Sequence, residues 1–325
     1  MSPHTTDVPR VVVLLATFDG MPYLPDQVRT VLDSEGVQVR IVASDDGSSD
    51  GTADWLAEQA AAEPRLTLLP AARSGSAAAN FYRLLLDADL ADDELVALCD
   101  QDDLWYPDKL ARSAAQIADG YAGVSSDVVA FRADGRRSYI RKAFPQRPFD
   151  YVCESPGPGS SFLLDPDLVA RCRARLADPD GPMRRMTYHD WAIYAVARGA
   201  GLRWQILDTP TLDYRQHDGN VMGARTGLRA YADRLRLVTS RWHRAQAALA
   251  AATAAQAAET ATEAPHQTGP VPAPPSDTDE LRELERLLAD TSLRARWALA
   301  RRAGALRRRR VDQVALAAMV MGGMW

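Results

Sequence analysis

Between residues 11 and about 130, short apolar segments alternate with segments whose apolar residues recur at helical spacing. The strands are expected at 11–15, 37–43, 66–69, 95–99 and 124–131. The helices are expected near 24–34, 52–62, 77–88 and 108–119. This alternation predicts an α/β fold with a mostly parallel central sheet flanked by helices. Sheets of this kind bind ligands beyond the carboxyl ends of their strands, so chemistry is expected in the loops that follow them.

The second half of the chain is less regular. The section 131–220 continues the first, with a Gly/Pro loop at 155–161 and an expected helix near 189–198. Twelve of the twenty residues from 245 to 264 are alanine, and the segment 265–275 contains five prolines, which is typical of a linker. We therefore expect a main domain over 1–225, a helical Ala-rich extension over 226–264, a Pro-rich linker over 265–278 and a helical basic tail over 279–325.

The composition is that of an ordinary globular chain, with 46% hydrophobic and 25% charged residues, which excludes a collagenous or wholly disordered protein. A net charge of −5 predicts no nucleic-acid partner. Three widely spaced cysteines exclude a disulfide framework and fit a reducing compartment. The polar N-terminus leads into an apolar run too short for a signal peptide or a spanning helix, so we expect a cytoplasmic protein.

Carboxylates follow two of the expected strands. In the segment 44–52, Asp45 and Asp46 could accept hydrogen bonds from a nucleoside base and its ribose. The alternative is a turn in which Ser49 or Asp50 caps the next helix. The second cluster is Asp100-Gln101-Asp102-Asp103, directly after the strand at 95–99.

Three carboxylates within four residues repel one another unless a cation lies between them. Oxygen ligands favour Mg²⁺ or Mn²⁺, and Mg²⁺ commonly shares its coordination with substrate phosphates. The second cluster therefore predicts a divalent-metal site. The alternative is a solvated acidic turn that caps the helix beginning near Pro107.

Two later segments carry further candidates. Asp190 lies between His189 and Trp191 at the start of an expected helix, and His217 lies in the segment 214–220. A carboxylate beside an aromatic residue could act as a general base if it reaches a substrate hydroxyl. The plain alternatives are a helix cap for Asp190 and ordinary packed or surface histidines.

Taken in order, these segments resemble the family 2 glycosyltransferases of the GT-A fold, and within them the bacterial rhamnosyltransferase-like enzymes of surface polysaccharide assembly. The resemblance covers about residues 10–222. It depends on seven motifs in the family's order, at 16–20, 44–52, 80–85, 99–110, 157–159, 189–191 and 214–220. Asp19 stands where many members have asparagine, and Ala16 where some have a hydroxyl residue, so the first loop does not identify the donor.

The resemblance implies a role for each candidate. Nucleotide and donor binding are implied for Thr17, Phe18, Asp19, Asp45, Asp46, Asp100 and Asp103. Metal binding is implied for Asp102 above all, with Asp100 and His217. The catalytic base is implied to be Asp190. The acceptor side is implied to include Gly157, Gly159, Ser160, His189 and Trp191.

The same resemblance implies the reaction. It is a metal-dependent, inverting transfer, with Mn²⁺ or Mg²⁺, from a nucleotide-diphosphate sugar to a hydroxyl of a cell-envelope or lipid-linked glycan. The first donor to expect is dTDP-L-rhamnose, followed by a UDP-hexose or UDP-galactofuranose. The alternatives are a non-catalytic nucleotide-binding protein of this fold and a sugar nucleotidyltransferase, although the latter usually has a Gly-rich basic loop that 17–20 does not resemble.

The segment 294–310 holds eight arginines and no acid, interleaved with Trp297, Leu299 and Leu306. Without it, the chain carries 30 basic and 43 acidic residues, so the main body is acidic. Such a segment can lie on an anionic membrane, at about 1 kcal/mol per basic side chain. We expect peripheral contact with the inner face of the plasma membrane. The alternative is a helix packed on the main domain or on a partner.

Overall fold

The computed structural model describes residues 8–217, 241–261 and 277–325. Within these ranges, a seven-stranded sheet has the order β10-β6-β9-β4-β1-β2-β3. Its strands in chain order are β1 (Arg10–Thr17), β2 (Gln38–Asp45), β3 (Leu66–Leu68), β4 (Leu95–Cys99), β6 (Gly123–Ser126), β9 (Leu163–Leu164) and β10 (Trp204–Leu207). All neighbours are parallel except β9, which runs antiparallel to β4 and β6. The predicted α/β class with a mostly parallel sheet is confirmed.

A second sheet corrects one expected strand. It has the order β5-β11-β7-β8, and its strands are β5 (Leu104–Trp105), β7 (Val128–Arg132), β8 (Arg137–Ile140) and β11 (Leu212–Gln216). The single strand predicted at 124–131 was wrong, because β6 ends before Asp127 and β7 begins after it in the other sheet. The buried Asp127 carboxylate accepts hydrogen bonds from the backbone N–H groups of Lys142 and Ala143. An apolar run does not reveal such a change of sheet.

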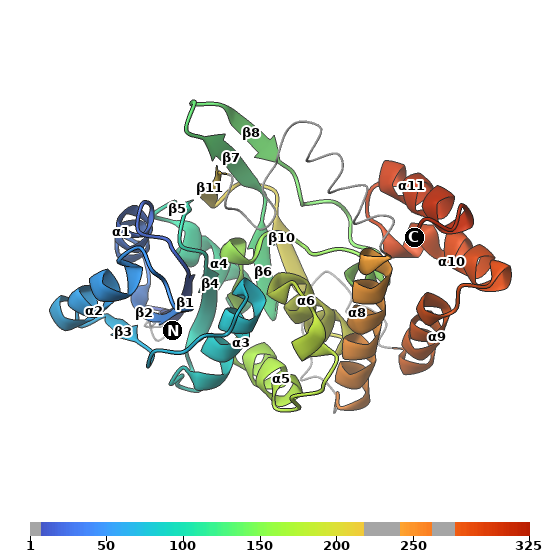
Figure 1. Ribbon diagram of the computed structural model, residues 1–325, viewed down its shortest axis with the longest axis horizontal. Coiled ribbons are helices and arrows are strands. Elements are labelled where there is room, and N and C mark those ends of the chain that lie inside the picture. Colours follow the sequence, from blue (N-terminus) through green and yellow to red (C-terminus); the bar gives the residue numbers. More distant parts are fainter. Residues whose placement is uncertain (1–7, 218–240, 262–276) are drawn as a thin grey trace, which may run out of the picture.

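The two faces of the main sheet carry different helices (Figure 1). In β1, Val11, Val13 and Leu15 share a hydrophobic cluster with α1 (Leu24–Leu32), α2 (Thr52–Ala62) and α4 (Lys109–Ala118). Val12 and Leu14 belong to the cluster that includes α3 (Ala77–Asp87), α5 (Pro166–Leu176) and α6 (His189–Gly199). Successive side chains of a strand point to opposite faces, which explains this division.

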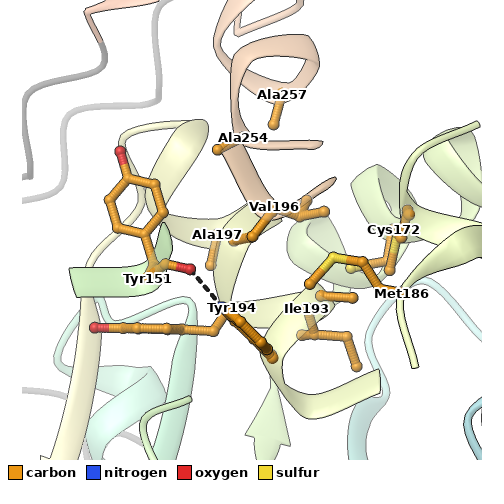
Figure 2. Close-up of a cluster of buried hydrophobic side chains, with 14 of the residues drawn as sticks. Tyr151, Cys172, Met186, Ile193, Tyr194, Val196, Ala197, Ala254 and Ala257 are labelled. Carbon is orange, nitrogen blue, oxygen red and sulfur yellow. Dashed lines mark hydrogen bonds between the residues drawn. The ribbon is translucent and has the colours of Figure 1, made fainter. Parts of the chain in front are cut away.

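The Ala-rich stretch forms α8 (Trp242–Glu259), which packs on α6. Ala254 and Ala257 of α8 lie next to Val196 and Ala197 of α6 (Figure 2). Small side chains allow the two backbones to approach closely, as Gly199 demonstrates: a Cβ atom at this position would lie 2.4 Å from the Ala254 carbonyl oxygen. The alanines therefore serve helix packing in the same core as the sheet.

Three further helices flank α8 on the side away from α6 (Figure 1). They are α9 (Thr278–Ala289), α10 (Leu293–Leu306) and α11 (Arg310–Met321). Their buried leucines join the hydrophobic cluster of α6 and α8. Most of the Pro-rich segment and residues 226–240 lie outside the described residues, so the four boundaries expected from composition stay predictions. No helix in the described ranges is long and apolar enough to cross a bilayer.

Gly199→Ala is expected to lower the free energy of unfolding by about 1–3 kcal/mol, because the added methyl group overpacks the contact between α6 and α8. Gly304→Ala in α10 is the matched control, since its added Cβ would lie 3.9 Å from the side-chain oxygen of Gln313, an ordinary contact distance. Alanine is the better helix former, so this control should be neutral or stabilising by up to about 1 kcal/mol. Urea denaturation measures both, and equal stabilities would contradict the close packing.

Candidate active site

The carboxyl ends of β1, β2 and β4 meet at one edge of the main sheet. In the parallel register, Thr17 of β1 lies beside Asp45 of β2, and Leu15 lies beside Cys99 at the end of β4. The loops that begin at Phe18, Asp46 and Asp100 therefore leave the sheet side by side. Three of the segments predicted to bind the donor are brought together by this register.

Gln101 joins the first of these loops to the acidic cluster. Its side-chain oxygen accepts a hydrogen bond from the backbone N–H of Phe18 at 2.8 Å, and its amide nitrogen donates to the Phe18 carbonyl at 2.9 Å. Gly20 leaves room for this side chain, since a Cβ there would lie 2.2 Å from the Gln101 oxygen. Sequence reasoning considered the aspartates and missed Gln101, although a neutral amide among carboxylates was the available signal.

Asp19 and Asp45 hold the backbone of the loops that are predicted to bind the nucleotide. Asp19 has a positive φ of 46°, and its carboxylate accepts a hydrogen bond from the Ser49 N–H at 2.7 Å. Asp45 accepts hydrogen bonds from the Thr17 hydroxyl at 2.9 Å and from the backbone and side chain of Ser48. Both aspartates therefore shape these loops through contacts within the protein.

Asp46 reaches the next loop, where its carboxylate accepts a hydrogen bond from the Gly75 N–H at 2.9 Å. Asp46 is buried, whereas the Phe18 side chain beside it in the first loop is 49% exposed. Of the residues predicted to bind the nucleotide, Phe18 thus offers a free aromatic surface.

The acidic cluster is closed by the end of β11. The Asp102 carboxylate lies 2.7 Å from Nε2 of His217, whose ring stacks on Tyr23. Arg215 donates two hydrogen bonds to the cluster: its backbone N–H donates to the Asp103 carboxylate at 3.0 Å, and its guanidinium donates to the Asp102 carbonyl oxygen at 2.7 Å. Residues more than 100 positions apart in the sequence thus meet here, among them two of the three predicted metal ligands.

The carboxylates of this cluster affect one another. Burial, with the charges of Asp102 and Asp190, raises the pKa of Asp100 to about 7. Burial, with the charges of Asp102 and Asp100, raises the pKa of Asp103 well above its usual range. The Oδ2 atom of Asp103 is buried without a well-formed hydrogen bond among the described residues. This accumulated negative charge favours the binding of a cation.

Two aspartates and an imidazole form a donor set that fits Mn²⁺ or Mg²⁺. The residues that could hold such an ion are Asp102, Asp100 and His217. In the part of the chain that the structure describes, no group of three His, Cys, Asp or Glu side chains is already arranged around a metal position. Binding would thus require these side chains to converge on the ion.

Asp190 lies in the first turn of α6, where the helix dipole favours a negative charge. One carboxylate oxygen accepts a hydrogen bond from the Trp191 N–H at 2.7 Å, and the other lies 3.0 Å from the Ser155 hydroxyl. Burial raises the pKa of Asp190, while these two hydrogen bonds and the charge of Lys142 oppose the rise. The charge of Asp190 in turn contributes to the raised pKa of Asp100.

The Gly/Pro loop packs against the start of α6. Gly159 begins the short helix η2 (Gly159–Ser161), and a Cβ there would lie 2.3 Å from Nε2 of His189. The His189 ring stacks on Phe81 with ring centroids 3.8 Å apart. A Cβ at Gly157 would lie 3.3 Å from the Ser126 carbonyl oxygen, and the Ser160 side chain is buried near Asp103. The loop thus lies between α6 and the acidic cluster.

Trp191, predicted on the acceptor side, lies in the core. It is only 4% exposed, and its indole N–H donates to the carbonyl of Tyr151 at 2.7 Å. Figure 2 shows Tyr151 in this cluster, beside Tyr194 of α6. The Trp191 ring points inward although it directly follows Asp190, because helical neighbours face different sides, and its place on the acceptor side stays a prediction.

Comparison with known proteins identifies the family. The sequence signature described as Glycosyl transferase family 2 matches residues 12–175. The chain is also 32% identical to the dTDP-rhamnosyl transferase RfbG of Shigella flexneri over 240 residues, which is 73% of this chain and 83% of the relative. The chain belongs to glycosyltransferase family 2.

Solved structures support the fold of this glycosyltransferase. Mannosyltransferase PcManGT from Pyrobaculum calidifontis, solved with GDP-Man and Mn²⁺, has a TM-score of 0.52 at 18% identity, over 98% of this chain and 86% of that one. TarS 1-349 from S. aureus, solved with UDP, has a TM-score of 0.50 at 14% identity, over 96% and 90%. The predicted GT-A fold and the enzyme class are confirmed, so neither the nucleotidyltransferase nor the non-catalytic alternative is retained.

His189 is expected to make the glycosyltransferase less stable in acid. Burial lowers its pKa to about 3, whereas a histidine in an unfolded chain titrates at about 6.5. Between these values the unfolded state binds a proton that the folded state does not bind. The free energy of unfolding therefore rises with pH, by up to about 1.4 kcal/mol per unit for one histidine.

The variant His189→Gln should reduce this slope by up to one proton, as measured by urea denaturation from about pH 4 to about pH 6. The slope should not vanish, because burial also lowers the pKa of His243, to about 4, and that residue is unchanged. A slope equal to that of the wild type would contradict the assignment of His189 as a buried neutral histidine.

Proposed function

We propose that this glycosyltransferase catalyses a metal-dependent, inverting transfer from a nucleotide-diphosphate sugar to a hydroxyl of a cell-envelope glycan. The observation that carries the proposal is the proximity of two kinds of carboxylate at one edge of the sheet. Asp100, Asp102 and Asp103 form a crowded anionic cluster, and Asp190 stands in the first turn of α6. The Gly/Pro loop joins the two, since Gly159 packs against His189 and Ser160 is buried near Asp103. The first set suits a cation and a diphosphate, and the second suits proton transfer.

The donor is held on the β1–β2–β4 side. Thr17, Phe18, Asp19, Asp45 and Asp46 form or support the nucleotide loops, and Asp100 and Asp103 complete the donor side. Mn²⁺ or Mg²⁺ would be held by Asp102, Asp100 and His217. Such an ion, when bound, supplies Lewis-acid stabilisation of the departing diphosphate. The Mn²⁺ and GDP-Man in the PcManGT structure support this part of the proposal.

Asp190 is the general base. An acceptor hydroxyl gives its proton to the carboxylate as its oxygen attacks the anomeric carbon of the donor. The bond between that carbon and the diphosphate oxygen breaks, and the diphosphate leaves with the electron pair. The Ser155 hydroxyl and the Trp191 N–H orient the carboxylate, while Gly157, Gly159, Ser160 and His189 form the acceptor side.

The preferred donor is dTDP-L-rhamnose, which the likeness to the dTDP-rhamnosyl transferase RfbG supports. A UDP-hexose and UDP-galactofuranose come next. The acceptor is a growing surface polysaccharide or a lipid-linked glycan. A panel of these nucleotide sugars, each incubated with the purified protein and with Mn²⁺, Mg²⁺ or a chelator, identifies the donor through metal-dependent release of the nucleoside diphosphate.

Asp190→Asn is expected to reduce turnover of the preferred donor by about 10²- to 10⁴-fold, because the amide cannot take up the proton. Binding of dTDP, measured by calorimetry, should stay near that of the wild type. Asp167→Asn is the matched control, since Asp167 also lies in the first turn of a helix, α5, and is half-exposed. Near-normal turnover by Asp190→Asn would remove this residue from the mechanism.

Exposed apolar and basic side chains on the C-terminal helices α10 and α11 support a contact with the membrane. Leu293, Trp297 and Arg301 follow one another at four-residue spacing along α10, and Leu293 and Trp297 are 73% and 55% exposed. On α11, Val311 and Val314 are also exposed. Arg294, Arg301, Arg309 and Arg310 surround these apolar groups with exposed positive charge. We propose that this surface contacts anionic lipid headgroups at the inner face of the plasma membrane, near a lipid-linked acceptor.

The double substitution Trp297→Ala with Arg301→Glu should weaken binding to anionic vesicles by about tenfold or more, since charge reversal alone changes the attraction by about 2 kcal/mol. Cosedimentation with phosphatidylglycerol vesicles measures this, and phosphatidylcholine vesicles should bind weakly. Arg136→Glu is the control, because Arg136 is an exposed arginine in the β7–β8 turn. Undiminished binding by the double variant would refute the proposed membrane surface.

A further inference from the structure

One arginine in the turn between α10 and α11, Arg308, is buried against the catalytic part of the chain. This turn comprises residues 307–309, and its central side chain, Arg308, is only 2% exposed. The next residue, Arg309, has a side chain that is 52% exposed. A backbone hydrogen bond of 3.0 Å from the Phe149 N–H to the Ala305 carbonyl holds the helical pair at the same place. The arginine-rich segment is therefore divided between the surface and the core.

Arg308 contacts the segment that precedes the Gly/Pro loop. Its Nε atom lies 3.3 Å from a carboxylate oxygen of Glu154 and 3.6 Å from one of Asp150. The backbone N–H of Arg308 donates to Glu154 at 2.6 Å, and its guanidinium donates to the carbonyl oxygen of Ser155. One side chain thus holds three positions of the segment 150–155.

The Asp150 carboxylate ties this contact to α6. Asp150 is fully buried, and Arg198 in the last turn of α6 lies 3.8 Å from its other oxygen. Burial raises the pKa of Asp150, whereas the charges of Arg198 and Arg308 oppose the rise. A buried carboxylate of this kind requires its cations, and removing one leaves an uncompensated charge. Arg308 is therefore needed to keep Asp150 in its buried position beside the last turn of α6.

The chain of contacts ends at the proposed base. Ser155, whose carbonyl accepts from Arg308, has its hydroxyl oxygen 3.0 Å from Asp190 and 2.7 Å from the Gly157 carbonyl oxygen. The hydroxyl has a single proton, so it donates to one of these two acceptors at a time. The position of the Ser155 backbone decides how well the hydroxyl reaches Asp190, and Arg308 holds that backbone.

We propose that Arg308 is a positioning residue for sugar transfer, which holds the segment 150–155 so that Ser155 orients Asp190. This inference rests on the proposed role of Asp190 as general base. It makes the turn between α10 and α11 a support of the active site, in addition to the lipid contact proposed for the outer faces of these helices. A small displacement of a reacting group can cost up to about 100-fold in rate, even when the altered residue does not touch the substrate.

The test compares Arg308→Met with Arg302→Met in the full-length protein. Arg302 lies in the same helical pair, but it pairs with Glu283 near the surface. The assay is metal-dependent release of nucleoside diphosphate from the sugar nucleotide that the wild type turns over in the donor panel. Arg308→Met should lower kcat by about 10- to 100-fold, with KM for the donor and the Kd for the nucleoside diphosphate within about twofold of the wild type. Arg302→Met should match the wild type, and Arg308→Lys should recover part of kcat.

A double-mutant cycle separates positioning from a general loss of structure. In the Asp190→Asn background, Arg308→Met should cause little further loss, because both substitutions affect the same group. Independent, multiplicative losses, a rise in KM without a fall in kcat, or wild-type kcat in Arg308→Met would overturn the inference. Wild-type turnover by Asp190→Asn would instead overturn the proposed base, so the two failures are distinguishable.

A milder substitution covers the case in which Arg308→Met does not fold. Glu154→Gln removes the charge of one partner of Arg308 and leaves Asp150 paired with both arginines. It should lower kcat in the same pattern but by a smaller factor, with the melting temperature close to that of the wild type. An unchanged kcat in a folded Glu154→Gln variant, together with a misfolded Arg308→Met, would count against positioning and in favour of a purely structural role.

Discussion

The crowding of carboxylates at the end of β4 is the constraint on which the rest of the site depends. Asp100, Asp102 and Asp103 fall within four consecutive residues, in surroundings that raise the pKa of Asp100 and Asp103. The fold offsets this repulsion with Arg215 of β11 and with His217, which directly follows β11. The negative charge of this cluster favours a cation, which is why we propose that the metal ion and the diphosphate of the donor bind at this edge of the sheet.

Asp190, on a separate helix, has different surroundings. Asp190 sits at a helix N-terminus, among hydrogen-bond donors, and is not part of the crowded cluster. The base that we propose must be able to ionise and must keep its orientation, and these contacts favour both. The same helix is anchored at its other end by Arg198 and Asp150, and Arg308 completes that buried ionic set. The basic C-terminal segment is therefore partly a structural element of the catalytic core.

Much of the fold could be read from local patterns. The strands β1 to β4 and the helices α1 to α4 fall where apolar runs and helical spacing placed them, because both signals arise from residues close in sequence. The prediction of a single strand at 124–131 was wrong because contacts outside this segment decide its structure. The chain passes from one sheet to the other at the buried Asp127, whose carboxylate binds the segment 139–143. Likewise, Ser155 carries no signal of its own in the sequence, and only the tertiary structure shows that its hydroxyl reaches Asp190.

The sequence alone determined which chemistry is present: aspartates at the ends of strands, a separate Asp190 and an arginine-rich end, in an order that identifies the family. These are properties of residue type and spacing, which the linear chain contains. The tertiary structure decided how that chemistry is supported. The contacts of Asp102 with His217 and of Arg308 with Glu154 join residues 115 and 154 positions apart. Hydrogen bonds and ion pairs depend on distances of a few ångströms, and only the packing of the folded chain sets those distances.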